Sequence, residues 1–144
     1  RQLLLSENEL PTLQDVLNYR RTHDGTLPLV VSVAPNDSVA EAVELLRRYG
    51  ISQMPVIEHG HIVGSLTENL LLRYLASGEE LVHATVSDLE GPPFSELHHD
   101  ALAQEAYTLF SAGHTAVAVM NGDALEGIVT KSDLLEFWAH NRMG

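Results

Sequence analysis

The chain has 144 residues, of which 44% are hydrophobic, and its 20 acidic against 8 basic side chains give a formal net charge of −12. This length suits one domain or a closely joined pair of half-domains, and the acidic balance argues against nucleic acid and anionic membranes as partners. The absence of cysteine excludes disulfides, thiolate zinc sites and cysteine nucleophiles, and no apolar run reaches the roughly 20 residues of a membrane span. We therefore expect a cytoplasmic globular module.

The first 26 residues precede the repeated part of the chain. Within them, Thr12–Arg20 is predicted to form a short helix, with Leu13, Val16 and Leu17 on one apolar face. A loop over residues 23–26 follows and leads to the first predicted strand.

The next segment reads as strand, helix, two strands and a second helix. The predicted strands are Leu29–Val33, Gln53–Ile57 and Ile62–Leu66, the last two forming a hairpin around residues 58–61. Ser38 and Glu41 make a capping box for the first helix, whose apolar face is Val39, Ala42, Val43 and Leu46 and whose end is Gly50. Thr67 caps the second helix, predicted over Glu68–Ser77.

The remaining residues have the same order of elements. Predicted strands cover Phe94–Leu97, Thr115–Met120 and Leu125–Val129, with the hairpin signal Asn121-Gly122 between the last two. Asp100 is predicted to cap the helix that carries Leu102, Ala106 and Leu109 and ends at Gly113. A closing helix is predicted over Ser132–His140, where Leu134 or Leu135, Phe137 and Trp138 belong to the core or to a dimer face.

The two segments are copies of each other at an offset of 63 residues, with ten identities and no gap between positions 37–76 and 100–139. The identical pairs are Asp37/Asp100, Ala40/Ala103, Leu46/Leu109, Gly50/Gly113, Val56/Val119, Gly64/Gly127, Thr67/Thr130, Leu71/Leu134, Leu72/Leu135 and Ala76/Ala139. This period is too long for a solenoid unit, so a duplicated subdomain is the better interpretation. One copy alone buries too little apolar surface, and two copies packed sheet to sheet form an α/β (α+β) module with pseudo-twofold symmetry.

The most informative junction is Gly127–Asp133, where a strand leads directly into the closing helix. The unpaired N–H groups and partial positive charge of a helix N-terminus favour an anionic ligand. Hydroxyls of Thr130 and Ser132 can reach a phosphate there, and Asp133 can accept from ribose hydroxyls. An alternative stays open, in which Thr130 is an ordinary N-cap and Asp133 a carboxylate that suits the helix dipole.

Lys131 is the only lysine in the chain and lies at the same junction. A cation in the first turn opposes the helix dipole, at a cost of roughly 0.3–1 kcal/mol. An anionic ligand explains its position, and a lysine that simply faces solvent explains it equally well.

The duplication, the order of elements and the motif G-h-x-T-x-S-D together resemble a cystathionine β-synthase (CBS) domain pair, the Bateman module. The resemblance covers residues 27–140, with repeat 1 at 27–84 and repeat 2 at 85–144, after the N-terminal helix and linker at 1–26. It implies that an adenosyl effector, AMP, ADP, ATP or S-adenosylmethionine, binds in the cleft between the repeats, with no covalently bound cofactor. The residues it assigns to the better site are Val30, Ile51, Ser52, Gln53, Met54, Pro55, Val129, Thr130, Lys131, Ser132 and Asp133.

The resemblance also gives these residues roles. Asp133 binds ribose, Thr130 binds ribose or phosphate, and the backbone around Ser52 and Gln53 reads the adenine edge. The side chains expected to sandwich the adenine ring are Ile51, Met54 and Val129. Replacement of Asp133 by alanine is expected to abolish ligand binding and to leave the fold intact.

The second site of the pair departs from the family pattern. Its residues are Thr67, Phe94, His114 and Thr115, and its carboxylate position is Leu70. Because leucine cannot accept a hydrogen bond from ribose, and because Glu68 repels phosphate, we expect weak binding or none there.

Three stretches resemble more narrowly the C-terminal regulatory region of bacterial cystathionine β-synthase-like PLP enzymes. They are residues 50–56, 64–68 and 91–94. With a chain that begins at Arg1 and not at methionine, this implies a piece of a longer protein with an attached catalytic domain. That resemblance favours S-adenosylmethionine, whereas Lys131 and Ser132 suit a phosphate chain better, and the sequence leaves the choice open.

Other chemistry has less support. Two groups of histidines are candidates for a metal site: His59 and His61 on one turn, and His98 and His99, with Asp100, before a helix. Because the two groups belong to different repeats, we expect scattered surface histidines and no metal site. No Ser, His and Asp converge for nucleophilic catalysis. We therefore expect a regulatory, non-catalytic homodimer that binds neither nucleic acid nor membrane, and the alternative is a structural dimerisation module whose clefts stay empty.

Overall fold

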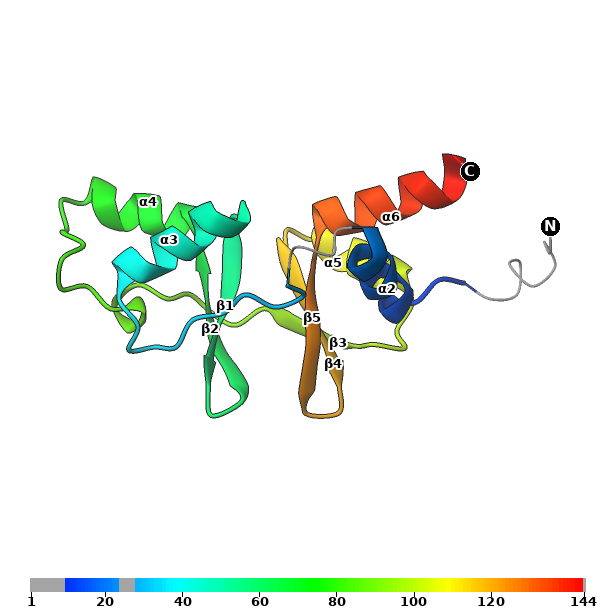
Figure 1. Ribbon diagram of the computed structural model, residues 1–144, viewed down its shortest axis with the longest axis horizontal. Helices are drawn as coiled ribbons and strands as arrows, with labels where there is room; N and C mark the ends of the chain where they lie inside the picture. Colours follow the sequence, from blue (N-terminus) through cyan, green and yellow to red (C-terminus); the bar gives the residue numbers. More distant parts are fainter. Residues whose placement is uncertain (1–9, 24–27, 144) are drawn as a thin grey trace. The chain divides into compact units, whose positions relative to one another are not determined.

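The computed structural model describes residues 10–23 and 28–143, which form α-helices, short strands and one 3₁₀ helix (Figure 1). The helices are α2 (Leu13–His23), α3 (Val39–Tyr49), α4 (Glu68–Ala76), η1 (Val86–Asp88), α5 (Ala103–Ser111) and α6 (Lys131–Met143). The strands are β1 (Gln53–Glu58), β2 (His61–Thr67), β3 (Ser95–His98), β4 (Ala116–Asn121) and β5 (Ala124–Thr130). In the part of the chain so described, no helix combines the length and the apolar character that crossing a membrane requires.

The chain divides into two compact units. Unit 2 is the continuous segment 30–94, and unit 1 combines residues 1–29 with residues 95–144. Helix α2, which lies outside the repeat, therefore belongs to the same unit as the second repeat. The 3₁₀ helix η1 lies in unit 2, so the compact units divide the chain differently from the repeat boundaries expected at residues 26 and 84.

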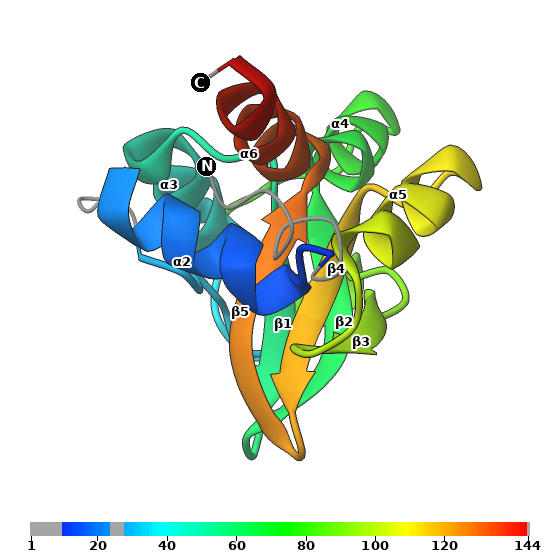
Figure 2. The ribbon, with the colours of Figure 1, turned by 90° about the vertical axis from the view of Figure 1, so that its right-hand side faces the viewer.

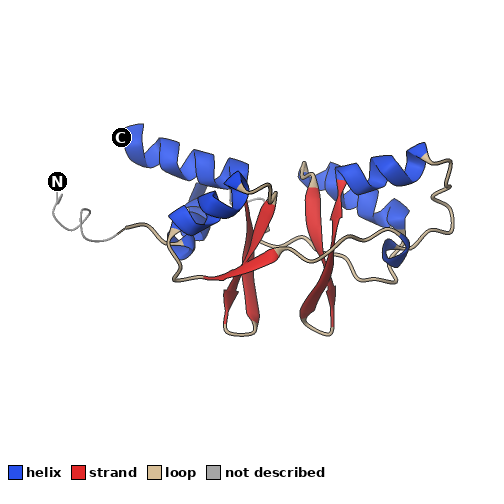
Figure 3. Cartoon of the chain, turned by 180° about the vertical axis from the view of Figure 1, so that it is seen from behind, coloured by secondary structure: helices blue, strands red, loops and turns tan. Residues whose placement is uncertain are grey.

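Unit 2 is built on the antiparallel hairpin of β1 and β2. The turn of the hairpin places His59 at φ 52° and Gly60 at φ 80°, and it points away from the helices of its unit (Figure 3). The core lies between the hairpin and its helices, with Val39, Met54 and Leu66 fully buried.

The predicted strand Leu29–Val33 does not form. Val33 alone makes a parallel bridge to Val56, with Val33 N–H donating to Pro55 O (3.2 Å) and Ile57 N–H to Val33 O (2.8 Å). Leu29 instead accepts a hydrogen bond from Ile128 N–H in unit 1 (3.4 Å). Because the chain passes from unit 1 to unit 2 at Leu29, the residues before Val33 do not pair with β1.

Unit 1 contains a three-stranded sheet with the strand order β3-β4-β5. Strands β3 and β4 are parallel, and strands β4 and β5 are antiparallel. Helix α2 runs across β5 (Figure 2) and inserts Leu17 over Gly127, where a Cβ atom would lie 2.7 Å from a methyl group of Leu17. Leu13, Val16 and Leu17 are fully buried in the same core as Val129 and Phe137. The predicted apolar face of this helix is thus confirmed, and the helix is a part of the core.

The N-cap residue is predicted correctly for two helices and wrongly for a third. Ser38 and Thr67 are N-caps, as predicted, accepting from Glu41 N–H (3.1 Å) and Leu70 N–H (3.2 Å). Asp100 as the cap of α5 is wrong, because the helix starts two residues later, with Leu102 at the N-cap position and Glu105 accepting from Leu102 N–H (3.1 Å). The first turn of the second repeat is therefore displaced by one residue from the gap-free alignment.

The burial of α2 predicts a large effect of truncating Leu17. Leu17→Ala should lower the free energy of unfolding by about 2–5 kcal/mol, because it removes a fully buried side chain and leaves a cavity over Gly127. The matched control is Leu72→Ala on α4, where the side chain is 64% exposed and the expected change is within about 0.5 kcal/mol. Urea denaturation measures both, and equal values for the two variants would show that α2 is not part of the core.

Candidate functional site

The junction of β5 and α6 is a closed capping box. Thr130 N–H donates to Asp133 Oδ2 (2.8 Å), the Thr130 hydroxyl donates to the same oxygen (3.1 Å), and Asp133 N–H donates to Thr130 Oγ1 (3.3 Å). The alternative that the sequence left open for these residues is therefore present, since Thr130 caps the helix and Asp133 completes the box. Both side chains are half-buried.

Arg20 of α2 forms an ion pair with this carboxylate. Its Nη1 lies 3.2 Å from Asp133 Oδ2, and the two side chains are only 12% and 17% exposed. The same guanidinium donates to the carbonyls of Ile128 (2.6 Å) and Pro28 (2.9 Å), whereas its buried Nε has no hydrogen-bond partner. Arg20 thus joins three separated segments of unit 1: α2, the residue before Leu29 and the β5–α6 junction.

The ion pair leaves one carboxylate oxygen available. The hydrogen bonds that the described residues make to the Asp133 side chain all fall on Oδ2. A carboxylate has about four acceptor positions on its two oxygens, so Oδ1 can accept from a diol without loss of the contacts that hold the side chain. Arg20 also compensates the negative charge that an anionic ligand would meet.

Lys131 and Ser132 occupy the first turn of α6 and are both exposed. They lie where the N–H groups of a helix N-terminus have no intrahelical acceptor. A cation, a hydroxyl and the helix dipole are thus present together beside Asp133, a combination that suits a phosphate or another anion.

The corresponding junction of β2 and α4 has the same cap and a different fourth residue. Thr67 Oγ1 accepts from Leu70 N–H as Thr130 Oγ1 does from Asp133 N–H, so the backbone arrangement of the two junctions is alike. Leu70 supplies no acceptor, and its methyl groups lie against Gly91. This junction therefore has a helix N-terminus without a carboxylate, and Glu68 is exposed in its first turn.

The residues predicted to bind adenine lie in unit 2, apart from Val129. Ser52 is exposed, Ile51 and Gln53 are half-buried, and Ser52 O accepts from Glu68 N–H (3.0 Å). Val30 is half-buried and Pro55 buried. Met54 and Val129 have no exposed surface and pack in the cores of units 2 and 1, so core packing accounts for both side chains. That these residues join Thr130 and Asp133 in one site stays a prediction.

The residues of the second, weaker site are distributed over both units. Thr67 is the N-cap of α4, and Phe94 is half-buried at the end of unit 2. In unit 1, His114 is half-buried and its Nδ1 lies 3.2 Å from Ser95 Oγ, while Thr115 is exposed. Their role in binding also stays a prediction.

Arg20 is a residue of the site that the sequence analysis does not predict, although the sequence contains a signal for it. Arg20 continues the spacing of Leu13, Val16 and Leu17, so it falls on the buried face of α2. A cation on an otherwise apolar helix face needs an acidic partner within the core. The partner itself, 113 residues further along the chain, could not be identified from spacing.

Comparison with known proteins agrees with this architecture. The model of the CBS domain family matches residues 28–77 and 86–140. The chain is 30% identical over 119 residues to a cystathionine beta-synthase of Dictyostelium discoideum, a match that covers 79% of this chain and spans 24% of the length of that protein.

Two solved structures are similar over nearly the whole chain. The CBS domain structure of NE2398 has a TM-score of 0.79 at 17% identity and covers 91% of this chain and 99% of that one. The CBS domain pair of protein MJ0100, in complex with 5-methylthioadenosine and S-adenosyl-L-methionine, has a TM-score of 0.73 at 20% identity and covers 92% and 99%. At these identities the likeness shows the fold.

The ion pair predicts that Arg20 stabilises unit 1. Arg20→Met should lower the free energy of unfolding by about 1–3 kcal/mol, because it leaves Asp133 largely buried without its cation. Arg47→Met is the matched control, since the Arg47–Glu44 pair on α3 is 74% and 49% exposed and should contribute less than about 0.5 kcal/mol. Thermal and urea unfolding measure both, and a loss no larger for Arg20→Met than for the control would contradict a structural role for the pair.

Proposed function

The chain belongs to the CBS domain family, and from this premise we propose that it is a regulatory module whose effector is an adenosyl compound, bound through the β5–α6 junction. The carrying observation is the Asp133 carboxylate, which Arg20 and Thr130 hold by one oxygen so that the other can accept from ribose hydroxyls. The CBS domain pair is a regulatory module, and a pair of the same fold is solved with S-adenosyl-L-methionine and 5-methylthioadenosine.

The ligand class follows from the chemistry of the junction. A vicinal diol matches a carboxylate oxygen, and the hydroxyl of Ser132, the ammonium of Lys131 and the N-terminus of α6 suit a phosphate group. AMP, ADP and ATP supply both groups, whereas S-adenosylmethionine supplies the diol and is bound by the solved CBS domain pair of MJ0100. The proposal is therefore an adenosyl effector, and the titration below distinguishes its members.

We also propose how the signal leaves the site. Arg20 connects Asp133 to α2 and to Pro28 O, so a ligand that changes the position of the carboxylate changes the packing of both segments. An effector shifts an equilibrium between two states only through a difference in its affinity for them. The attached catalytic domain, which we propose to be cystathionine β-synthase-like, would then respond to the position of α2, and the chain itself performs no catalysis.

A matched pair of variants tests the ligand site. Thr130→Val and Thr67→Val each remove the side-chain cap of a helix at equivalent places of the two repeats, at a cost of about 1 kcal/mol each. Only Thr130→Val should weaken binding of AMP, ATP or S-adenosylmethionine, by at least about tenfold, because only its junction has the carboxylate. Isothermal titration calorimetry measures affinity and stoichiometry, and one ligand per chain is expected.

Asp133→Asn completes this test, because asparagine keeps the shape but not the charge. Asp133→Ala is less suitable than asparagine, since it removes the acceptor of the capping box and of the ion pair together with the proposed ligand contact. Equal effects of the two threonine variants would refute the site. No stabilisation of the unaltered chain by any of the three ligands would favour a structural dimerisation module instead.

Exposed leucines on α4 and α6 support the proposal of a homodimer through these helices. Leu72 and Leu135 are 64% and 69% exposed. By contrast Leu134 and Phe137 are core residues, and Trp138 is half-buried.

Glutamate at these two positions should therefore disrupt association. Leu72→Glu/Leu135→Glu is expected to shift the chain to a monomer in sedimentation equilibrium, because a charge cannot be buried in an apolar interface without a partner. The control is Val82→Glu, at a residue 74% exposed outside both helices, which should leave the mass unchanged. A double variant that sediments as the unaltered chain would contradict this interface.

A further inference from the structure

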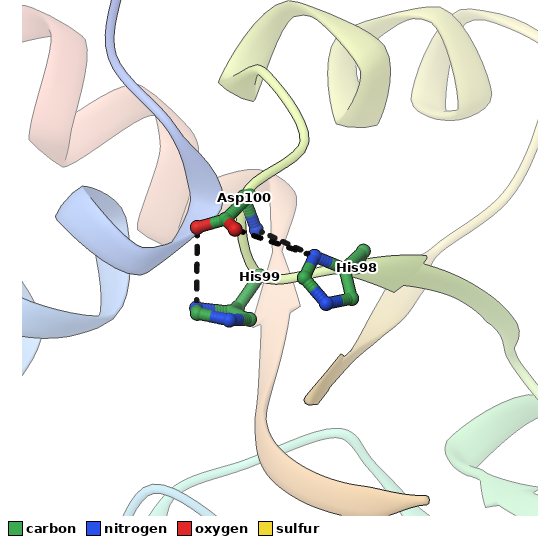
Figure 4. A group of neighbouring side chains, drawn as sticks. All are labelled: His98, His99 and Asp100. Atoms are coloured by element: carbon green, nitrogen blue, oxygen red, sulfur yellow. Dashed lines mark hydrogen bonds and ion pairs between the residues drawn. The ribbon is translucent and has the colours of Figure 1, made fainter. Parts of the chain in front are cut away.

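We propose that the turn between β3 and α5 binds one divalent transition-metal ion through His98, His99 and Asp100, independently of the adenosyl site. Within the described part of the chain, these three residues form the one group of metal-ligating side chains whose donor atoms all lie within 4.8 Å of one another. Figure 4 shows the two imidazoles turned toward the carboxylate that lies next to them in the chain.

The distances are close to those of a ligated ion. The Nδ1 atoms of His98 and His99 lie 3.8 Å and 3.6 Å from the two oxygens of Asp100. Tetrahedral ligands with bonds of about 2.0–2.2 Å are separated by about 3.3–3.6 Å. Closing this difference requires a rotation of His98 that gives up the hydrogen bond its Nδ1 accepts from Asp100 N–H (3.2 Å), and the side chains of His98 and Asp100, 53% and 74% exposed, have room for it.

Helix α2 places an amide oxygen beside His99. Gln14 Oε1 lies 3.1 Å from His99 Nδ1, and its amide nitrogen donates to Asn18 Oδ1 (3.0 Å), which keeps the oxygen directed at the histidine. Because an amide oxygen only accepts, His99 Nδ1 carries the proton in this arrangement. A metal ion would replace that proton, which passes through solvent to Nε2, so that the imidazole stays neutral.

The histidines are not required by the turn itself. The equivalent turn of the first repeat is closed by the same hydrogen bond, Asp37 N–H to Ala34 O (3.1 Å), as Ala101 N–H to His98 O (2.9 Å) in the second. Its residues 34–36 are Ala-Pro-Asn, so the same backbone forms without an imidazole or a carboxylate at these positions. In the second repeat all three positions carry ligands instead.

The donor set indicates the class of metal. Two imidazole nitrogens with a carboxylate and an amide oxygen suit Zn²⁺, Cu²⁺ or Ni²⁺, whereas Mg²⁺ prefers oxygen ligands alone. The site would fasten the start of α2 to this turn, which Gln14 N–H and Leu13 N–H already contact through His99 O and Ala101 O. Zn²⁺ is the probe for the test because it has no redox chemistry.

The variants replace residues of one repeat by those at the equivalent positions of the other. His98→Ala/Asp100→Asn introduces the residues of the first turn and should weaken Zn²⁺ binding by at least about tenfold in calorimetry of the full chain. The control, His59→Gly/His61→Ala, introduces the residues of the β4–β5 hairpin into the β1–β2 hairpin and should leave affinity and the stoichiometry of one ion unchanged. Mg²⁺ should give no binding heat.

Two further measurements keep the result decisive. Circular dichroism verifies that both variants fold, and the imidazole NMR signals of His98 and His99 in the unaltered chain should shift with Zn²⁺ while that of His114 stays in place. The proposal is overturned if the unaltered chain does not bind Zn²⁺, if the two double variants bind it equally, or if other histidines shift instead. None of these outcomes depends on whether an adenosyl ligand binds at Asp133.

Discussion

The ion pair of Arg20 and Asp133 is the interaction on which the geometry of the candidate site depends. It is largely buried, and it connects a helix outside the repeat to the carboxylate that the family resemblance assigns to ribose. Breaking such a pair from one side leaves a charge without a partner, which costs more than the intact pair contributes. The geometry of the candidate site is therefore maintained by α2 as much as by α6, and a change at either end affects the other.

The same pair distinguishes the two strand–helix junctions of the repeats. Both have a threonine cap at the strand–helix junction, with the same hydrogen bond to the residue three positions later. In the second repeat that residue is an aspartate held by Arg20, and in the first it is a leucine against Gly91. The two copies thus share the backbone of the junction, while only the second has the carboxylate, whose cationic partner comes from α2 outside the repeat.

Much of the fold was accessible from sequence because it depends on local patterns. Ser38 and Thr67 were identified as caps, and the hairpins and the apolar face of α2 follow from spacing and turn residues. The prediction of a strand at Leu29–Val33 is wrong because β-branched residues do not reveal that the chain passes from one unit to the other there. Only a single bridge at Val33 forms. The prediction of Asp100 as the N-cap of α5 is wrong because the N-cap residue is Leu102, whose side chain has no acceptor and therefore gives no capping signal in the sequence. At the candidate site, the motif predicts Thr130 and Asp133 as ligand residues, which stays a prediction, whereas Arg20 depends on a contact over 113 residues that no local pattern indicates.

A crystal structure of the chain with S-adenosylmethionine or AMP tests the central claim most directly. We expect a ribose hydroxyl within hydrogen-bond distance of Asp133 Oδ1, roughly 2.5–3.0 Å, with Arg20 still paired to Oδ2. A ligand whose ribose contacts neither Asp133 nor Thr130 would contradict the account, and so would a carboxylate that has left Arg20 without any ligand contact.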